Sequence, residues 1–450
     1  MGGFLAPLPR DEMIAYLVYD LILLLISPLL LGCHLFRSRR RGRPAALAAR
    51  LGRIPPEEKV RTGDAVTIWV HAVSVGETMA VRPLLKELKK RFPAPRIILS
   101  NITETGRSVA LKIEEADRCV YFPFDYGFAV SRVLDAIRPS LVIIVETEIW
   151  PNFLRQASKR HIPVILANGR ISDRSYGRYL RFRWFFRRIV GDFSAFCMQT
   201  GDDARRIIVM GARESKVHVA GNLKFDNLPC PKDGEGKAAS RRNYRIPEGC
   251  TVVVAASTHP GEEDGFLEAC RDLLMSGQRI ILVVVPRHPE RAEAVTALLS
   301  QSGITSIRRT ALDDSTGELS PGTALLVDTV GELMNIFAIA DLAFVGGSLQ
   351  PVGGHNLLEP ASLGVPIIFG PHMENFREIA DLVLSYEAGM QVADVEGLAA
   401  ALRRLLGDSA LRREMGGNGL RLLRENGGAT FRHMEVITQF MHRKTADGVG

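Results

Sequence analysis

The chain opens with one long apolar segment. From Met13 to Phe36 nearly every residue is hydrophobic, and Asp20 is the only acid among them. That length is sufficient to cross a hydrocarbon core of about 30 Å. A basic run follows directly, which predicts a cytoplasmic body and an N-terminus on the opposite side of the membrane. We therefore predict a membrane anchor over residues 13–36; the alternatives are a buried core helix and a helix lying in the membrane interface. The basic run consists of Arg37, Arg39, Arg40, Arg41 and Arg43.

Behind this segment, short β-branched runs alternate with amphipathic stretches of helical length, a pattern typical of parallel βαβ units. The first series of predicted strands is Thr67 to Val73, Arg96 to Asn101, Leu141 to Val145, Pro163 to Ala167 and Ala195 to Gln199. The second series is Thr251 to Ala256, Ile280 to Val285, Ala324 to Val327, Leu342 to Val345 and Pro366 to Phe369. Helical patterns then extend to the C-terminal end.

A polar stretch rich in proline, glycine and lysine separates the two series. We interpret it as a linker over residues 227–249. The sequence thus predicts an α/β protein with an anchor at 13–36, a Rossmann-like acceptor domain at 37–226 and a Rossmann-like donor domain at 250–442. In such a protein the two domains are expected to face each other across a cleft, with ligands beyond the carboxyl ends of the strands.

Composition narrows the choice of partners. The 450 residues are 46% hydrophobic and 24% charged, which is typical of globular proteins of two or three domains. The net charge of +7 favours anionic partners, namely nucleic acid, acidic lipid or phosphorylated ligands. Six scattered cysteines without a C-x-x-C pair indicate reduced thiols, not a disulfide or zinc framework.

Three motifs of the first series place charged side chains after predicted strands. In HAVSVGETMA, Glu77 opens a helix, where it is suited to act as a general base or merely to cap the helix. In VETEIWPN, Glu146 and Glu148 follow a hydrophobic strand, with a solvated loop end as the alternative. In GNLKFD, Lys224 is placed to hold a phosphate or carboxylate, unless it is an ordinary surface lysine.

The second series carries the signature of a phosphorylated ligand. Arg287 in VVVPRHPER is placed for bidentate phosphate recognition. Residues 344–366 contain two glycine pairs followed by a predicted helix, so that the backbone is able to approach a phosphate closely, although an ordinary glycine-rich turn is the alternative. Glu359, one turn into that helix, is a candidate acceptor of hydrogen bonds from ribose hydroxyls.

Other signals are weaker or missing. The segment RYLRFRWFFRR at 178–188 is compatible with a membrane-surface patch, a nucleic-acid patch or a packed amphipathic helix. The sequence contains no P-loop, no G-x-S-x-G elbow and no Asp-x-Asp metal signature. We therefore expect a reaction that needs no metal.

The motifs together resemble a known family. HAVSVGE, VETEIWPN, NGRIS, GNLKFD, ASTHPGEE, PRHPER, DTVGEL, FVGGSL and GGHNLLEPA occur here in the order typical of 3-deoxy-D-manno-octulosonic acid (Kdo) transferases of lipopolysaccharide assembly. The resemblance implies a GT-B fold, CMP-Kdo as the donor substrate and the lipid A precursor lipid IVA as the acceptor. It also implies inversion without a metal or cofactor, and a place at the bacterial inner membrane with no nucleic-acid partner.

The resemblance also implies roles for individual residues. Glu77 would be the general base, and Glu146 and Lys224 would stabilise the transition state. The residues implied to contact CMP are Pro286, Arg287, Val330, Gly331, Glu332, Asn356, Leu357, Leu358 and Glu359. Two alternatives stay open: another membrane-associated GT-B enzyme that uses a UDP-sugar, and a membrane-tethered basic module that only binds anionic lipid.

Overall fold

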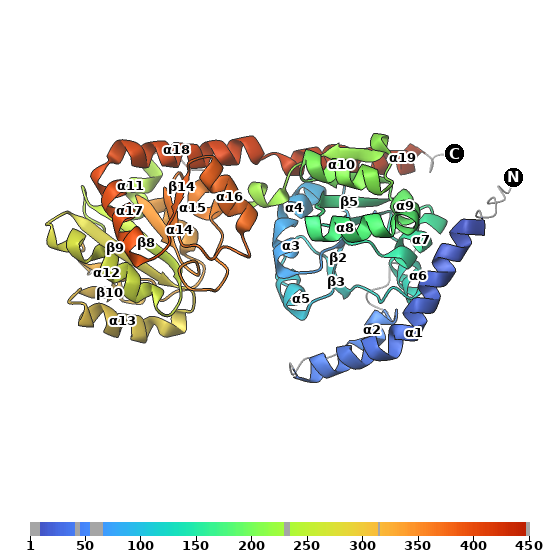
Figure 1. Ribbon diagram of the computed structural model, residues 1–450, viewed down its shortest axis with the longest axis horizontal. Coiled ribbons are helices and arrows are strands. Elements are labelled where there is room, and N and C mark those ends of the chain that lie inside the picture. Colours follow the sequence, from blue (N-terminus) through green and yellow to red (C-terminus); the bar gives the residue numbers. More distant parts are fainter. Residues whose placement is uncertain (1–9, 41–45, 55–65, 229–234, 314–315, 447–450) are drawn as a thin grey trace. The chain divides into compact units, whose positions relative to one another are not determined.

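The computed structural model describes residues 10–40, 46–54, 66–228, 235–313 and 316–446. The chain divides into two compact units (Figure 1). Unit 1 comprises Met1–Asn227 together with Gly427–Gly450, and unit 2 comprises Leu228–Asn426.

Unit 1 is built on a seven-stranded parallel sheet in the order β3-β2-β1-β4-β5-β6-β7. Alternate residues of β1 enter the apolar cores on its two faces, with Trp69 on one face and Ile68 and Val70 on the other. The strands are β1 Thr67–His71, β2 Arg96–Asn101, β3 Arg118–Tyr121, β4 Leu141–Val145, β5 Val164–Gly169, β6 Ala195–Met198 and β7 Val217–Val219. The five predicted strands are confirmed, whereas the short edge strands β3 and β7 escaped prediction because little of each is buried.

Helices cover both faces of this sheet (Figure 1). Several begin at a side chain that caps the first turn, as Thr103 does for α5 and Thr200 for α10. The helices are α1 Arg10–Arg40, α2 Leu47–Arg50, α3 Val75–Ala80, α4 Arg82–Arg91, α5 Glu104–Ala110, α6 Gly127–Ile137, α7 Pro151–Lys159, α8 Asp173–Arg181, α9 Arg183–Gly191, α10 Gly201–Met210 and α19 Ala429–Ala446.

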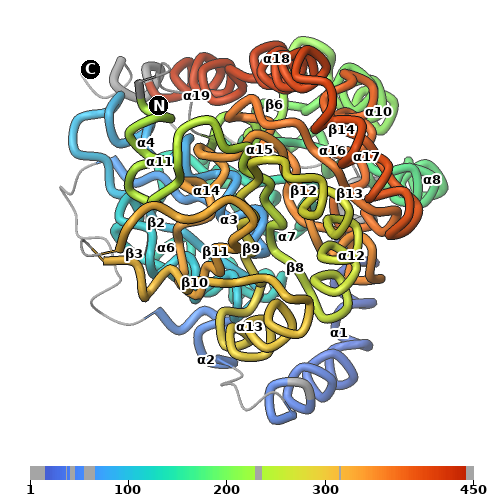
Figure 2. The backbone as a smooth tube through the Cα atoms, turned by 90° about the vertical axis from the view of Figure 1, so that its left-hand side faces the viewer, coloured from blue at the N-terminus to red at the C-terminus, as the bar shows by residue number. Residues whose placement is uncertain are grey.

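Unit 2 repeats the architecture with the order β10-β11-β9-β8-β12-β13-β14, again fully parallel. Figure 2 labels these strands along the backbone. Its strands are β8 Thr251–Thr258, β9 Ile280–Pro286, β10 Ser306–Arg308, β11 Ala324–Leu326, β12 Leu342–Val345, β13 Ile367–Phe369 and β14 Gly389–Gln391. Its helices are α11 Glu235–Asn243, α12 Glu262–Met275, α13 Ala292–Gln301, α14 Leu333–Ile339, α15 Leu358–Ser362, α16 Arg377–Ser385, α17 Val395–Gly407 and α18 Ser409–Asn426.

The predicted linker at 227–249 differs from the structure over most of its described residues. Residues 229–234 lie outside the described part, but α11 follows and packs on unit 2. There Arg241 donates to the carbonyl oxygen of Ile339 at 2.9 Å and pairs with Asp341. Tyr244 and Ile246 are buried in the apolar core of the same unit. Unit 2 therefore begins before residue 250.

The C-terminal end of the predicted donor domain, 250–442, is also placed differently. Helix α19 buries Ala429 and Ile437 in the core of unit 1, beside β1 and β2. The backbone N–H of Asn168 on β5 donates to Nε2 of His433 at 2.9 Å. The last described helix thus belongs to the first domain. The prediction of a single linker between two continuous domains was wrong on this point.

In each sheet the order of the strands reverses at one point. The reversal lies between β1 and β4 in unit 1 and between β8 and β12 in unit 2. Ligands of doubly wound sheets bind beyond the carboxyl ends of the strands at such a point. The residues that follow β1, β4, β8 and β12 are therefore the first to consider as a site.

Candidate functional site

Glu77 occupies the N-terminal turn of α3, directly after β1. Its carboxylate accepts the backbone N–H of Val73 at 2.7 Å and the hydroxyl of Ser74 at 2.8 Å. Ser74 in turn accepts the backbone N–H of Glu77 as the N-cap. The carboxylate therefore caps the helix and is at the same time held at the strand end; the capping contacts are observed, and the role of Glu77 as a general base stays a prediction.

Glu146 is the first residue after β4, on the other side of the strand reversal. Its backbone has φ 60°, the left-handed region that a residue with a side chain adopts only at a cost. The turn is kept by β5, since the Glu146 N–H donates to the carbonyl oxygen of Ala167 at 2.8 Å. Strained backbone of this kind is concentrated at functional sites. The strain supports a role for Glu146 beyond that of a loop end.

Glu148 joins the other two acids. Burial, and then the negative charges of Glu77 and Glu146, raise the pKa of Glu148 to about 7. The charge of Glu148 also helps to raise the pKa of Tyr179, after burial, which places that tyrosine on the same side. The β1/β4 reversal therefore gathers three acids, one of which exchanges a proton near neutral pH.

Lys224 lies on the short helix η3, Leu223–Asn227, which packs against α3. Its segment is fixed at both ends. The Leu223 N–H donates to Oδ1 of Asn168 at 3.0 Å, and the Asn227 amide donates to the carbonyl oxygen of Met79 on α3 at 3.3 Å. The structure thus brings the element that carries Lys224 beside the helix that carries Glu77.

In unit 2 the strand reversal carries two imidazoles that meet through their Nε2 atoms. His259 follows β8 and His355 belongs to the glycine-rich loop after β12; their ring centroids are 5.3 Å apart and their Nε2 atoms 3.0 Å apart. His288, after β9, lies edge-on to His259 at 5.9 Å. Burial, then His259 and Arg287, lower the pKa of His355 to about 4. The imidazole pair beside the Arg287 guanidinium is suited to an anionic ligand.

Glu262 holds the glycine-rich loop through hydrogen bonds to its backbone. Its buried carboxylate accepts the backbone N–H groups of Gly347 at 2.6 Å and of Ser348 and Leu349 at 2.9 Å. A Cβ atom on Gly346 would lie 2.7 Å from its Oε2, so this position requires glycine. A single acid thereby holds the loop that follows β12.

Arg287 and Pro286 stand at the end of β9. The backbone N–H of Arg287 donates to the carbonyl oxygen of Thr258 at 3.0 Å, which joins the ends of β9 and β8. Arg287 also acts electrostatically on Glu359 and His355, so that it faces the glycine-rich loop. The residue predicted to bind phosphate is thus placed beside the imidazole pair.

The turn before α14 presents its backbone. Val330 is 86% exposed and Gly331 has a left-handed φ of 90°. The Glu332 carboxylate is engaged by Nε of Arg309 at 2.9 Å and by the hydroxyl of Tyr244 at 3.2 Å. A ligand at this turn therefore meets main-chain groups and the Val330 side chain before it meets the Glu332 carboxylate.

The turn into α15 is arranged in a similar way. Asn356 accepts the Leu358 N–H at 3.1 Å and donates to Glu359 at 3.2 Å. Burial raises the pKa of Glu359. Leu357 and Leu358 are almost fully buried in unit 2, main chain included.

The sequence-predicted residues thus fall into two groups. Glu77, Glu146 and Lys224 belong to unit 1, and the nine residues implied for CMP belong to unit 2. The predicted site did not include three residues that lie at the same strand ends, namely His259, Glu262 and His355. The signal was present, because ASTHPGEE and GGHN each follow a predicted strand.

Known proteins are similar to this chain over most of its length. Residues 45–227 match the family model described as 3-deoxy-D-manno-octulosonic-acid transferase (kdotransferase). The 3-deoxy-D-manno-octulosonic acid transferase of Haemophilus influenzae is 35% identical over 381 residues, which cover 84% of this chain and 87% of that protein. The Bordetella pertussis protein of the same name is 31% identical over 438 residues, covering 94% of this chain and 99% of that one.

A solved structure shows the fold. The UDP-GlcNAc 2-epimerase of Neisseria meningitidis superposes with a TM-score of 0.55 at 12% identity, covering 83% of this chain and 100% of that one. At that identity the likeness shows the architecture alone. It is the GT-B architecture of two Rossmann-like units, as the sequence predicts.

Proposed function

This chain belongs to the 3-deoxy-D-manno-octulosonic acid (Kdo) transferase family, and from that premise we propose that it transfers Kdo from CMP-Kdo to lipid IVA with inversion of the anomeric centre. As a member of this family it is a glycosyltransferase of lipopolysaccharide biosynthesis. The donor, the acceptor, the inversion and the lack of a metal requirement are the proposed part.

The observation that carries the mechanism is the group of acids at the β1/β4 reversal. An inverting transfer needs one base to take the proton of the acceptor hydroxyl. In the proposed step the hydroxyl oxygen bonds to the anomeric carbon, the bond from that carbon to the CMP phosphate oxygen breaks, and the proton passes to Glu77. Its two hydrogen bonds, from Val73 and Ser74, hold the carboxylate in place for this role.

Glu146 and Lys224 stabilise the charges that develop in this step. Positive charge grows on the sugar ring, and a fixed carboxylate at Glu146 stabilises it. Negative charge is present on the sugar carboxylate and on the departing phosphate, and the ammonium group of Lys224 is a point charge suited to either. Glu146 directly follows β4, where its N–H donates to Ala167 of β5. Lys224 lies on η3, which packs against α3.

We assign donor binding to unit 2. Arg287 provides N–H donors for the CMP phosphate, and the His259–His355 pair lies beside it. The exposed turn at Val330, Gly331 and Glu332 and the segment from Asn356 to Glu359 would contact the nucleoside. Because CMP is already a good leaving group, these donors are sufficient without a metal in the proposed scheme.

The proposed location is the cytoplasmic face of the inner membrane, where the acceptor is a lipid with phosphate groups. A basic chain with an apolar N-terminal helix fits such a surface. Nucleic acid is not a proposed partner.

The test is transfer of radiolabelled Kdo to purified lipid IVA, with CMP-Kdo generated in situ and a chelator present. We expect labelled product from the wild-type enzyme and none from Glu77→Gln. Competition by CMP but not by UDP would separate this function from that of a UDP-sugar transferase. A folded enzyme that transfers only after divalent metal is restored would contradict the metal-free scheme.

A further inference from the structure

The polar side chains of α1 lie along one stripe that faces unit 1. Tyr16, Tyr19 or Asp20, and Ser27 recur at intervals that bring them to the same side of a helix. Each meets a polar partner on the globular part of unit 1, from α7, the residue that follows α9 or the loop before α6. The contacts are Tyr16 to Asp192 at 2.8 Å, Tyr19 to Asp125 at 2.9 Å, Ser27 to Tyr126 at 2.7 Å, Asn152 to Asp20 at 2.6 Å and Arg155 to Asp20 at 3.7 Å.

The contact extends along most of the helix. His34, near the other end of α1, packs edge-on against Phe124 with ring centroids 5.6 Å apart. At about 1.5 Å per residue, the stretch from Tyr16 to His34 is about 27 Å long. Contacts with unit 1 are therefore spread over nearly the length that a helix needs to cross a hydrocarbon core of about 30 Å.

The opposite face of α1 is apolar and exposed. Leu25 is 71% exposed and Leu29 69%. The other exposed side chains of this face are Leu17, Val18, Leu21, Ile22, Leu24 and Ile26. A patch of this kind on a soluble surface marks an interaction site.

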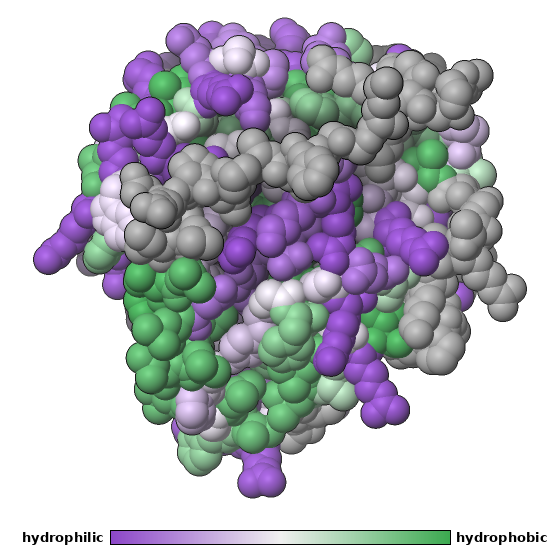
Figure 3. Space-filling view, turned by 90° about the vertical axis from the view of Figure 1, so that its right-hand side faces the viewer, coloured by the Kyte–Doolittle hydropathy of each residue, from purple (hydrophilic) through white to green (hydrophobic). Residues whose placement is uncertain are grey.

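A basic, aromatic surface adjoins this face. Helix α9 touches α1 through Phe185 and Tyr19, whose ring centroids are 6.0 Å apart. Exposed on α8 and α9, and between them, are Leu180, Phe182 and Trp184 among Arg174, Arg178, Arg181, Arg183 and Arg187. Figure 3, which views the side of unit 1 on which α1 lies, shows hydrophobic side chains gathered in a patch with hydrophilic ones around it.

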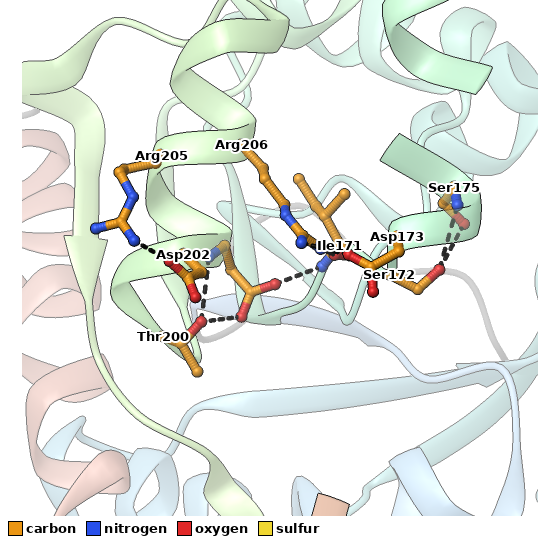
Figure 4. Close-up of polar contacts among 9 residues, drawn as sticks. Ile171, Ser172, Asp173, Ser175, Thr200, Asp202, Arg205 and Arg206 are labelled. Carbon is orange, nitrogen blue, oxygen red and sulfur yellow. Dashed lines mark hydrogen bonds and ion pairs between the residues drawn. The ribbon is translucent and has the colours of Figure 1, made fainter. Parts of the chain in front are cut away.

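The start of α8 is held to helix α10. Ser172 caps α8, and Arg206 of α10 reaches the carbonyl oxygen of Ile171 and the carboxylate of Asp173 (Figure 4). The Ile171 N–H donates to Asp203 of α10 at 2.7 Å. The start of α8 is thus fixed, and its arginines are presented on a set surface.

From these observations we infer that α1 lies in the plane of the membrane surface instead of crossing it. The occupant of its exposed face is a bilayer that contains anionic phospholipid: the leucines enter the acyl boundary and the arginines of α8 and α9 meet the headgroups. A crossing helix would have to carry Asp125, Arg155 and Asp192 into the hydrocarbon, where charged groups are costly, or leave their α1 partners behind. The inference rests on the proposed function only in taking a membrane as the location.

Topology provides the first test. In a Cys33→Ser, Cys119→Ser and Cys230→Ser background, a cysteine placed at Gly3 is treated in spheroplasts with a membrane-impermeant maleimide. A helix in the plane keeps this residue on the cytoplasmic side, so we expect labelling only after the cells are lysed. Labelling of intact spheroplasts, to the level reached after lysis, would overturn the inference.

Vesicle binding provides the second test. The purified full chain is sedimented with vesicles of phosphatidylethanolamine and phosphatidylglycerol. We expect Leu21→Glu with Leu25→Glu to weaken binding at least about tenfold, since it puts charge into the acyl boundary. Arg178→Glu with Arg181→Glu should remove most of the dependence on phosphatidylglycerol. Met275→Glu, at a 71% exposed position of unit 2, is the matched control and should bind as wild type does.

The same variants separate this inference from the catalytic proposal. None of the changed residues is assigned to catalysis, so Kdo transfer to acceptor in detergent micelles should persist in all of them. Vesicle binding unchanged by the leucine substitutions would sink the in-plane inference even if transfer is confirmed. Loss of transfer in micelles by wild-type protein would instead count against the proposed function.

Discussion

His259 and His355 point their Nε2 atoms at each other, 3.0 Å apart and with their ring planes only 11° from parallel, at the point where the strand order of unit 2 reverses. The two nitrogens share one hydrogen bond, so one imidazole donates and the other accepts. The pair joins β8 to the glycine-rich loop after β12, the two segments between which a doubly wound sheet binds its ligand.

This relationship predicts a pH dependence of nucleotide binding. Burial first, and also the neighbouring His288 and Arg287, lower the pKa of His259, and the pKa of His355 falls to about 4. A bound phosphate favours the protonated form and raises both pKa values again. Binding is then coupled to proton uptake, and CMP affinity should increase as the pH falls from 8 to 6.

The measurement is CMP titration by calorimetry at pH 6, 7 and 8. His355→Ala should bind CMP more weakly, and most of the increase in CMP affinity between pH 8 and pH 6 should be lost. His218→Ala, on β7 of unit 1, should match the wild type. The slope that the variant keeps reports the titration of the nucleotide itself. Equal slopes in His355→Ala and wild type would argue against a phosphate at this pair.

Glu77→Gln should lose transfer while CMP still binds. The amide cannot take the acceptor proton, and a general base contributes about 10²–10⁴-fold to the rate. CMP is assigned to unit 2, so its dissociation constant should not change. Single-turnover transfer and CMP calorimetry on the same preparation measure the two properties.

Ser74→Ala is the control for the capping role of Glu77. It removes one hydrogen bond to the carboxylate and the N-cap, at a cost of about 1 kcal/mol in stability, but leaves the base in place. We expect it to lose much less activity than Glu77→Gln. If both variants fall equally, Glu77 acts as a helix cap and another group is the base.

The raised pKa of Glu148 predicts that the free energy of unfolding changes with pH. The unfolded carboxyl loses its proton near its ordinary pKa of 4.5, while the folded one keeps it up to about 7. The folded state therefore binds more protons between these values, and the free energy of unfolding decreases as the pH rises through this window. Glu148→Gln removes this contribution and should stabilise the protein by about 1–3 kcal/mol at pH 8, with little effect at pH 5.

Urea unfolding in detergent at pH 5 and pH 8 measures this difference. Glu114→Gln, at an exposed position of the same unit, serves as the matched control and should show no pH-dependent gain. A Glu148→Gln variant whose stability changes with pH as the wild type does would mean that Glu148 is ionised throughout.

Glu262→Ala should disorder the glycine-rich loop of unit 2. It leaves the N–H groups of Gly347, Ser348 and Leu349 without their acceptor, and we expect a loss of about 3–5 kcal/mol in the unfolding of unit 2. CMP binding should weaken by at least about tenfold, because each 1.4 kcal/mol of loop preorganisation is a factor of ten in affinity.

Thermal unfolding and CMP titration check this, with Glu268→Ala on the exposed face of the same helix as control. The control should retain both properties. Normal CMP binding in Glu262→Ala would show that the loop is held by other contacts.

Several features were decided by the sequence alone. The buried strands such as Leu141–Val145 and Ile280–Pro286 are continuous apolar runs, and the segments between them have helical periodicity. These are local patterns, so all ten predicted strands were found. Motifs such as SVGE and GGHN are also local, and they were sufficient to identify the family and the strand ends at which Glu77 and Asn356 lie.

Other features depended on contacts between distant residues. The sequence assigns α19 to the second domain because it follows that domain, but the burial of Ile437 beside β1 places it in unit 1. The pKa of Glu148 depends on burial and on two acids, Glu77 of α3 and Glu146 after β4. The loop after β12 depends on Glu262, 85 positions before Gly347. The apolar pattern of residues 13–36 predicts a helix but not its surroundings. Only the docking of Tyr16, Asp20 and Ser27 onto unit 1 decided which side faces protein, because a partner from another element leaves no periodic trace in the sequence.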